Sequence, residues 1–185
     1  FADRRVEPDK LLSLFEAARL APSVHNTQPA RFVVGQRGIG STYERLFRCL
    51  SDGNQRWAHT APVLVLAAVT KLRFSQREAA LVPYPHCTHD LGLAMMSLIV
   101  QAQSLGLLCH PMAGFEPEQA RCEFNIPSLF EPMVVVAVGY LGSPDALPED
   151  LREREVARRT RRPLGELIFE ETWEQSLSLL YADVT

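Results

Sequence analysis

The chain has 185 residues and an apolar fraction of 46%, a composition that predicts a single globular domain over residues 1–185 with a substantial core. Its 19 basic and 22 acidic residues give a net charge of −3, so neither nucleic acid nor an anionic membrane is indicated as a partner. The 4 cysteines are scattered without a C-x-x-C pair, and no secretory signal or apolar run of about 20 residues is visible. This pattern favours reduced thiols and a cytoplasmic location.

Helices and strands are expected to alternate along the chain. Helical spacing of apolar residues predicts helices at 8–20, 41–53, 89–105, 117–124 and 173–181, and a charged helix at 149–159. Ser41 and Glu44 have the spacing of a capping box at the start of the second helix. Apolar and β-branched runs predict strands at 31–34, 61–69, 107–112 and 133–141, with a short one at 166–169, while 71–85 carries no assignment. This order indicates a three-layer α/β or α+β domain.

A short polar loop separates the first helix from the first strand. Pro22 and Pro29 bound it, and each disfavours α-helical backbone in the residue before it. The helix should therefore stop near Ala21, and Gln28 should be extended. The polar side chains between the prolines are Ser23, His25, Asn26, Thr27 and Gln28. A stiff segment rich in donors and acceptors suits a flat, hydrogen-bonding ligand, whereas the simpler interpretation is an ordinary helix-to-strand connection.

Two further segments have the chemistry of ligand contacts. Pro111–Gly114 follows a predicted strand, and its glycine lets the backbone approach a ligand and offer N–H groups, although alone it reads as an ordinary turn. The arginines at 158–162 have no acidic neighbour in sequence, which suits a phosphate. A basic surface patch explains those arginines almost as well.

Other familiar motifs are absent or incomplete. Gly35, Gly38 and Gly40 do not form the G-x-G-x-x-G fingerprint, and there is no P-loop. The cluster at 86–90 has poor spacing for zinc, and Cys109 and His110 point to opposite faces if they lie on a strand. We therefore expect neither a metal site nor a thiolate pair.

Taken together and in this order, the segments resemble the flavin-dependent nitroreductase family. The stretch Glu16-Ala-Ala-Arg-Leu-Ala-Pro-Ser-Val-His-Asn-Thr-Gln-Pro is similar to the family's helix ending in A-P-S-x-x-N-x-Q-P. Further matches extend to about Trp173, and they are Ala61-Pro62, Asp90-Leu-Gly92, Gly106-Leu, Pro111-Met-Ala-Gly114-Phe115, Gly139-Tyr140 and Arg161-Arg162-Pro163-Leu164.

The resemblance implies an α+β fold, a three-layer α/β/α sandwich with a central mixed, mainly antiparallel sheet. It also implies an intertwined homodimer with one FMN per subunit at the interface, and a C-terminal segment at about 163–185 that embraces the partner. The helix at 89–105, apolar nearly all round, suits a domain centre or such an interface. The residues implied to contact FMN are Ser23, Asn26 and Gln28 from the neighbouring subunit, Asn54 at the ring's polar edge, Pro111, Met112, Ala113 and Gly114 along the isoalloxazine ring, and Arg159 and Arg161 at the phosphate.

The implied activity is that of an oxidoreductase in which NADH or NADPH reduces the flavin and leaves. A nitroaromatic, quinone or other electron-poor aromatic then takes the same face in a ping-pong cycle, so no catalytic acid–base side chain is required. Members usually begin with Arg-Arg-Ser, which is expected before Phe1 here, because Arg4 and Arg5 lie too far along. The alternatives are flavin fragmentation or reductive dehalogenation on the same scaffold, or a flavin- or nucleotide-binding protein without turnover.

Overall fold

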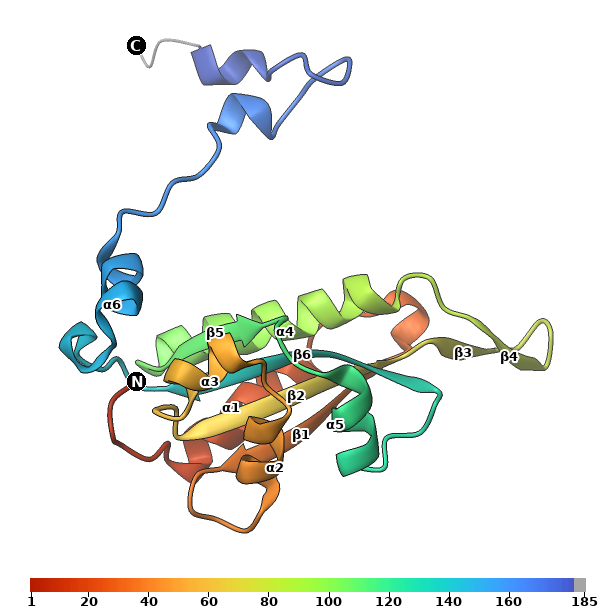
Figure 1. Cartoon of the computed structure of the whole chain (residues 1–185). Coiled ribbons are helices and arrows are strands. Elements are labelled where there is room, and N and C mark those ends of the chain that lie inside the picture. Colours follow the sequence, from red (N-terminus) through yellow and green to blue (C-terminus); the bar gives the residue numbers. More distant parts are fainter. Residues whose placement is uncertain (182–185) are drawn as a thin grey trace. The chain divides into compact units, whose positions relative to one another are not determined.

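The computed structural model describes residues 1–181 of the chain. They fall into two compact units, Phe1–Ala146 and a second that begins at Leu147 (Figure 1). The single domain expected over residues 1–185 stays a prediction.

A four-stranded sheet in the order β1-β2-β6-β5 forms the centre of the first unit. The strands are β1 (Ala30–Gln36), β2 (Val63–Thr70), β5 (Leu108–Met112) and β6 (Phe130–Gly139). Each neighbouring pair is antiparallel. β2 is buried at every position before Thr70, which agrees with the continuous apolar run from which it was predicted.

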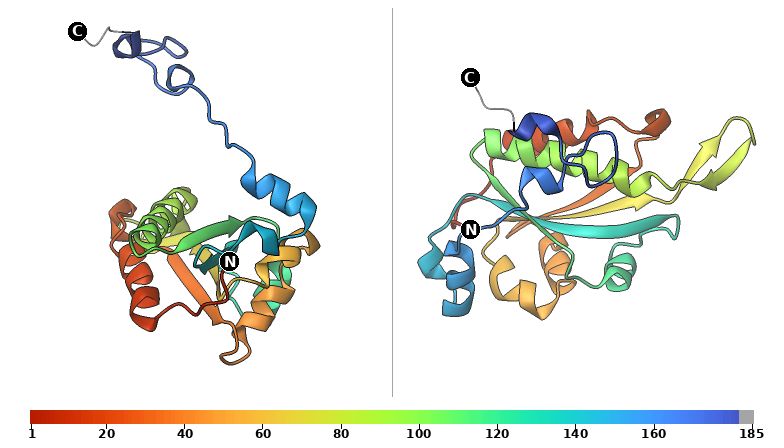
Figure 2. Two further views of the ribbon diagram at one scale, coloured as in Figure 1. Left: turned by 90° about the vertical axis from the view of Figure 1, so that its left-hand side faces the viewer. Right: turned by 90° about the horizontal axis from the view of Figure 1, so that it is seen from above.

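Helices cover both faces of this sheet (Figure 2). Val63 and Val65 of β2 pack into a core with α1 (Pro8–Arg19) and α4 (Cys87–Ser104). Leu64 and Leu66 point the other way, into a core with α2 (Thr42–Arg48), α3 (Asp52–Ala58) and α5 (Pro117–Glu123). The alternation of side chains along a strand thus supplies both cores. The α+β fold of three layers predicted from the sequence is confirmed.

The long helix α4 is less buried than expected. Leu91, Met95 and Leu98 lie in the core, but Met96 and Val100 are 54% and 52% exposed. The helix ends before Gly106, whose φ of +73° is the left-handed conformation in which helices commonly terminate. Within residues 1–181, no helix combines the length and the apolar character that crossing a membrane requires.

One prediction for the first unit needs correction, and the segment left without an assignment has a defined structure. The helix expected at 41–53 is two helices, α2 and α3, and the Ser41 side chain makes no capping bond. Residues 71–85 contain a hairpin of β3 (Leu72–Ser75) and β4 (Ala80–Pro83), paired with each other only. Phe74 and Leu81 face each other across the hairpin and are more than half exposed. Because these strands are not buried, their sequence lacks the continuous apolar run that predicts a buried strand.

The second unit has little regular structure. Its elements are α6 (Glu149–Val156), η3 (Leu164–Glu166) and η4 (Ser178–Tyr181). The strand expected at 166–169 is wrong, because only Phe169 pairs there, in a single bridge to Ser176. The helix expected at 173–181 is wrong as well, and Trp173 and Leu179 are 81% and 72% exposed. Short helices without an apolar surface to pack on are marginal in water. Residues 182–185 of the predicted embracing segment lie outside the described residues.

Candidate functional site

The polar loop after α1 has a strained backbone. The chain forms a short 3-10 turn, η1 (Val24–Asn26), and His25, Asn26 and Gln28 have φ of +55°, +54° and +48°. Such left-handed backbone is uncommon for residues other than glycine, and each instance costs about 1–3 kcal/mol. Gln28 is therefore not extended as predicted. The Gln28 amide N–H donates to the Ser23 hydroxyl at 2.9 Å, and this bond fixes the turn.

The side chains of this loop differ in how many of their hydrogen-bonding groups remain available to a ligand. Ser23 accepts the bond from Gln28 and so braces the loop, with its hydroxyl hydrogen still available. Gln28 is exposed, and its amide makes only a long bond of 3.4 Å to the Asn26 carbonyl. The Asn26 side chain is exposed and unpaired within residues 1–181. Asn26 and Gln28 thus present two amide groups to solvent.

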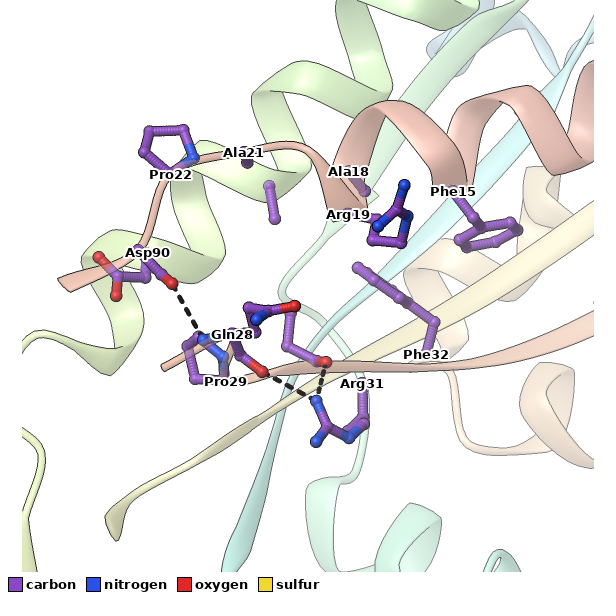
Figure 3. A pocket seen from close by; sticks show the side chains of 13 residues that line it. Phe15, Ala18, Arg19, Ala21, Pro22, Gln28, Pro29, Arg31, Phe32 and Asp90 are labelled. Carbon is purple, nitrogen blue, oxygen red and sulfur yellow. Dashed lines mark hydrogen bonds between the residues drawn. The ribbon is translucent and has the colours of Figure 1, made fainter. Parts of the chain in front are cut away.

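A groove lies between this loop, α1 and β1 (Figure 3). It holds about 220 Å³, and its lining combines apolar side chains such as Phe15 and Phe32 with polar ones, which are Arg19, Ser23, Gln28, Arg31 and Asp90. Binding pockets for cofactors and drug-sized ligands usually measure roughly 300–1,000 Å³. The groove is therefore too small to be a whole cofactor site.

The segment Pro111–Gly114 lies at the end of β5 and contacts α3. The Gly114 carbonyl accepts bonds from the Asn54 side chain at 2.8 Å and from the Ser51 amide at 3.0 Å. A Cβ at Gly114 would lie 2.7 Å from the Ser51 hydroxyl, so the close approach requires glycine. Ala113 and Gly114 are exposed, and among residues 1–181 no acceptor is seen for their amide N–H groups. The structure thus brings Asn54 together with Pro111–Gly114, as a shared site requires.

These two groups of predicted site residues are far apart in one chain. η1 lies beside the start of α4, while α3 and β5 lie toward its other end (Figures 1 and 2). The loop at 22–29 and the Asn54–Gly114 group therefore do not form one pocket within a single chain.

The predicted phosphate ligands belong to the second unit. Arg159 and Arg161 are exposed, and neither has an acidic partner within the described residues. Arg161 donates only to the neighbouring Thr160 carbonyl at 2.8 Å. Arg162, by contrast, lies 3.7 Å from the Glu166 carboxylate. Two guanidinium groups remain available to an anion.

The thiol and metal predictions can be compared with the geometry directly. Cys109 packs into the core, where burial raises its pKa to about 12, while the His110 ring contacts the Trp57 ring in a tilted arrangement with centroids 4.4 Å apart. The two side chains therefore point apart, as expected. Among residues 1–181, no group of three or more His, Cys, Asp or Glu side chains is placed to hold a metal ion.

Sequence reasoning missed a buried polar cluster under the loop. The Asp90 carboxylate, at the start of α4, accepts hydrogen bonds from the Val24 amide at 2.9 Å and from the Tyr84 hydroxyl. Asp90 and Tyr84 are each 2% exposed. Burial opposes ionisation of Asp90, but bonds from Tyr84, His89 and Val24 outweigh it and lower its pKa. In the sequence, Asp90 belongs to the segment at 86–90 and to the motif Asp90-Leu-Gly92, and neither pattern predicts a contact with the loop.

The structure is an α+β fold in which two groups of candidate ligand-contacting residues lie toward opposite ends of α4. Residues 1–41 and 39–140 match the model of the nitroreductase family. The chain therefore belongs to the nitroreductase family, and its class is accordingly that of the oxidoreductases.

Relatives and solved structures agree with this membership. A 15.4 kDa protein from the ask 5′ region of Mycolicibacterium smegmatis is 33% identical over 154 residues, covering 80% of this chain and 99% of that protein. A Streptomyces coelicolor protein, provisionally named an NADH dehydrogenase/NAD(P)H nitroreductase, is 31% identical over 162 residues and covers 79% of each chain. A crystal structure described as an oxidoreductase containing FMN superposes with a TM-score of 0.88 at 33% identity, covering 95% of this chain and 87% of that one.

Proposed function

We propose that this chain is an FMN-dependent oxidoreductase that uses NADH or NADPH to reduce nitroaromatic, quinone or related electron-poor compounds. The observation that carries the proposal is the pair of amide N–H groups at Ala113 and Gly114, beside Asn54, for which residues 1–181 provide no acceptor. The FMN in a structure with a TM-score of 0.88 supports the cofactor, and the name of the Streptomyces relative supports the nicotinamide donor.

The residues of the chain fit FMN in two chemically different ways. The isoalloxazine ring has a polar edge of carbonyl and ring nitrogen atoms, which exposed amides such as Asn26, Gln28 and the backbone at Gly114 can pair. Gly114 lets this backbone pack against α3, because a Cβ there would lie 2.7 Å from the Ser51 hydroxyl. The exposed guanidinium groups of Arg159 and Arg161 suit a phosphate.

A second copy of the chain would complete the site. The groove beside Ser23 and Gln28 is small, and the Asn54–Gly114 group lies away from it in the same chain. A homodimer in which the loop of one copy meets the Asn54–Gly114 group of the other would unite them. The exposed apolar side chains of Met96 and Val100 on α4 offer a surface for such a contact.

The residues of the chain bind and orient, while bound FMN would supply the hydride chemistry itself. Asn26, Gln28 and the Ala113–Gly114 amides would fix the position of the ring by hydrogen bonds. Asn54 keeps the Gly114 carbonyl paired and so turns the neighbouring N–H groups outward. Because no side chain has to transfer a proton, one open face can serve nicotinamide and aromatic substrate in turn. The free cysteines support a cytoplasmic location for this chemistry.

The direct test is reduction of the flavin. Purified protein reconstituted with FMN should lose its oxidised flavin absorbance when mixed anaerobically with NADH or NADPH, and a nitroaromatic or quinone should restore it. Full-length wild-type protein that cannot be reconstituted with FMN would contradict the cofactor assignment. Protein that binds FMN but keeps it oxidised with both nicotinamides would instead indicate a flavin-binding protein without this turnover.

The arginines can be tested separately with two forms of the flavin. Replacing both Arg159 and Arg161 by alanine should weaken FMN binding about 10- to 100-fold, because charge-assisted bonds to the phosphate are lost. Riboflavin lacks the phosphate, so its affinity should not change. Arg162→Ala is the matched control, since that side chain already faces Glu166. An equal loss of both flavins in the double variant would argue that the arginines act on folding instead of on the phosphate.

A further inference from the structure

Three segments of the first unit meet at one buried carboxylate. Asp90 lies in the first turn of α4, Tyr84 follows the β3–β4 hairpin directly, and Val24 opens η1 in the polar loop. One oxygen of Asp90, Oδ2, accepts from both the Val24 amide and the Tyr84 hydroxyl. The other, Oδ1, lies 3.1 Å from Nδ1 of His89.

The cluster contacts the loop at both polar groups of the Val24 backbone. The Tyr84 hydroxyl also lies 3.4 Å from the Val24 carbonyl, and the Thr27 hydroxyl donates to the same carbonyl. Val24 is therefore held at its N–H by Asp90 and at its carbonyl by Thr27. His25 and Asn26, the next residues, carry the strained left-handed backbone.

Strain of this size persists only where neighbouring contacts hold it. Without such contacts a loop without glycine relaxes to ordinary backbone angles and turns its side chains elsewhere. If a ligand binds only the strained conformation, its apparent affinity falls in proportion to the fraction of molecules that still adopt that conformation. The buried hydrogen bonds to Asp90 oppose this relaxation. If the loop moved away, the buried donors that Asp90 now accepts from would lose their partner, which costs free energy.

We propose that Asp90 and Tyr84 are positioning residues that hold the loop at Ser23–Gln28 in the conformation that binds FMN. They act through Val24, and at 2% exposure each they offer a ligand almost no surface of their own. The inference rests on the proposed function for the identity of the ligand, but the effect on the loop itself can be measured without flavin.

The first measurement is FMN affinity in three variants, by titration of flavin fluorescence. Asp90→Ala removes the acceptor of two buried bonds and should weaken binding about 10- to 100-fold. Tyr84→Phe removes one of the two and should weaken it about 3- to 10-fold. Asp90→Asn keeps a carbonyl oxygen that can accept both bonds, so it should remain within about threefold of wild type.

The matched control is Tyr43→Phe, in the opposite layer. Tyr43 is 3% exposed, and its hydroxyl donates to the Ala61 carbonyl at 2.8 Å. Its loss should lower the melting temperature about as much as Tyr84→Phe does, with no change in FMN affinity. A role of Tyr84 in stability alone would make the two phenylalanine variants equal in both measurements.

The second measurement is hydrogen–deuterium exchange of the flavin-free protein. Amides at 24–28 should exchange faster in Asp90→Ala and Tyr84→Phe than in wild type, while amides of β2 should not. If wild type binds FMN and both variants bind it equally well, the inference is overturned and the proposed function stands. If wild type does not bind FMN, the proposed function fails, and unchanged exchange at 24–28 would then overturn the holding role as well.

Discussion

Replacing Met96 by arginine is expected to separate the proposed homodimer into monomers and to reduce FMN affinity by at least about 100-fold. Met96 and Val100 lie one turn apart on α4 and are each about half exposed, and Gly92, a turn earlier, has open space around it. We call these three residues the α4 stripe. A charge buried without a partner in an apolar interface costs several kcal/mol, and about 1.4 kcal/mol is a factor of ten. Light scattering after size-exclusion chromatography and flavin titration would measure the two effects.

The control for this prediction is Ile39→Arg. Ile39 is 50% exposed, like Met96, but it lies in the turn between β1 and α2, outside the α4 stripe. It should leave the molecular mass in solution and the flavin affinity unchanged. A Met96→Arg protein that stays dimeric, or a monomer that binds FMN as wild type does, would contradict a cofactor site shared between two copies. Circular dichroism separates either result from simple unfolding.

The centre of the fold could be predicted because its signals are local and strong. β2 and β6 are long runs of apolar and β-branched residues. A strand that is buried on both faces is typically apolar at nearly every position, so such a run predicts it. The ends of α1 and α4 follow from Pro8 and Gly106, whose backbone preferences act whatever surrounds them. These features depend on the residues themselves more than on distant contacts.

The elements that the sequence did not predict depend on their surroundings more than on their own residues. In the hairpin at 72–83, Phe74 and Leu81 pair across two strands that add nothing to the main core, so no burial pattern marks them. The apolar residues at 173–181 do have helical spacing, but most of them are exposed in the second unit. Spacing predicts a helix only where a surface exists to bury one face.

For the candidate site as well, local sequence patterns predict some features, and contacts between distant residues determine the others. Asn26, Gln28 and Pro111–Gly114 could be named because the resemblance rests on short contiguous motifs. Their conformations could not, since the left-handed φ of Gln28 depends on its bond to Ser23. Asp90 and Tyr84 lie 66 and 60 residues from Val24 in sequence, and only the folded chain brings them beneath the loop. Motifs therefore propose residues for ligand contact, whereas the contacts that set the conformation of those residues are found in the structure.

Gly35→Ala is expected to destabilise the fold by about 3 kcal/mol, at the upper end of the range for overpacking. Gly35 is buried in β1, and a Cβ there would lie 2.6 Å from both Cα and N of Tyr43 in α2. Both atoms are backbone, so the strand and the helix would have to move apart. α2 covers the sheet face that holds Leu64 and Leu66, and that core would open with it.

Urea unfolding of the flavin-free protein, at one fixed protomer concentration, measures this effect as a lower midpoint with little change in slope. Gly53→Ala is the matched substitution, because a Cβ at Gly53 in α3 meets nothing within 4 Å. It should stabilise the protein by about 0.5–1 kcal/mol through helix propensity. If Gly35→Ala lowers the free energy of unfolding and Gly53→Ala raises it, the close approach of β1 to α2 decides the effect at Gly35. A general effect of replacing glycine would give both variants the same sign. Equal shifts would mean that α2 can yield, and that the contact at Tyr43 is looser than 2.6 Å suggests.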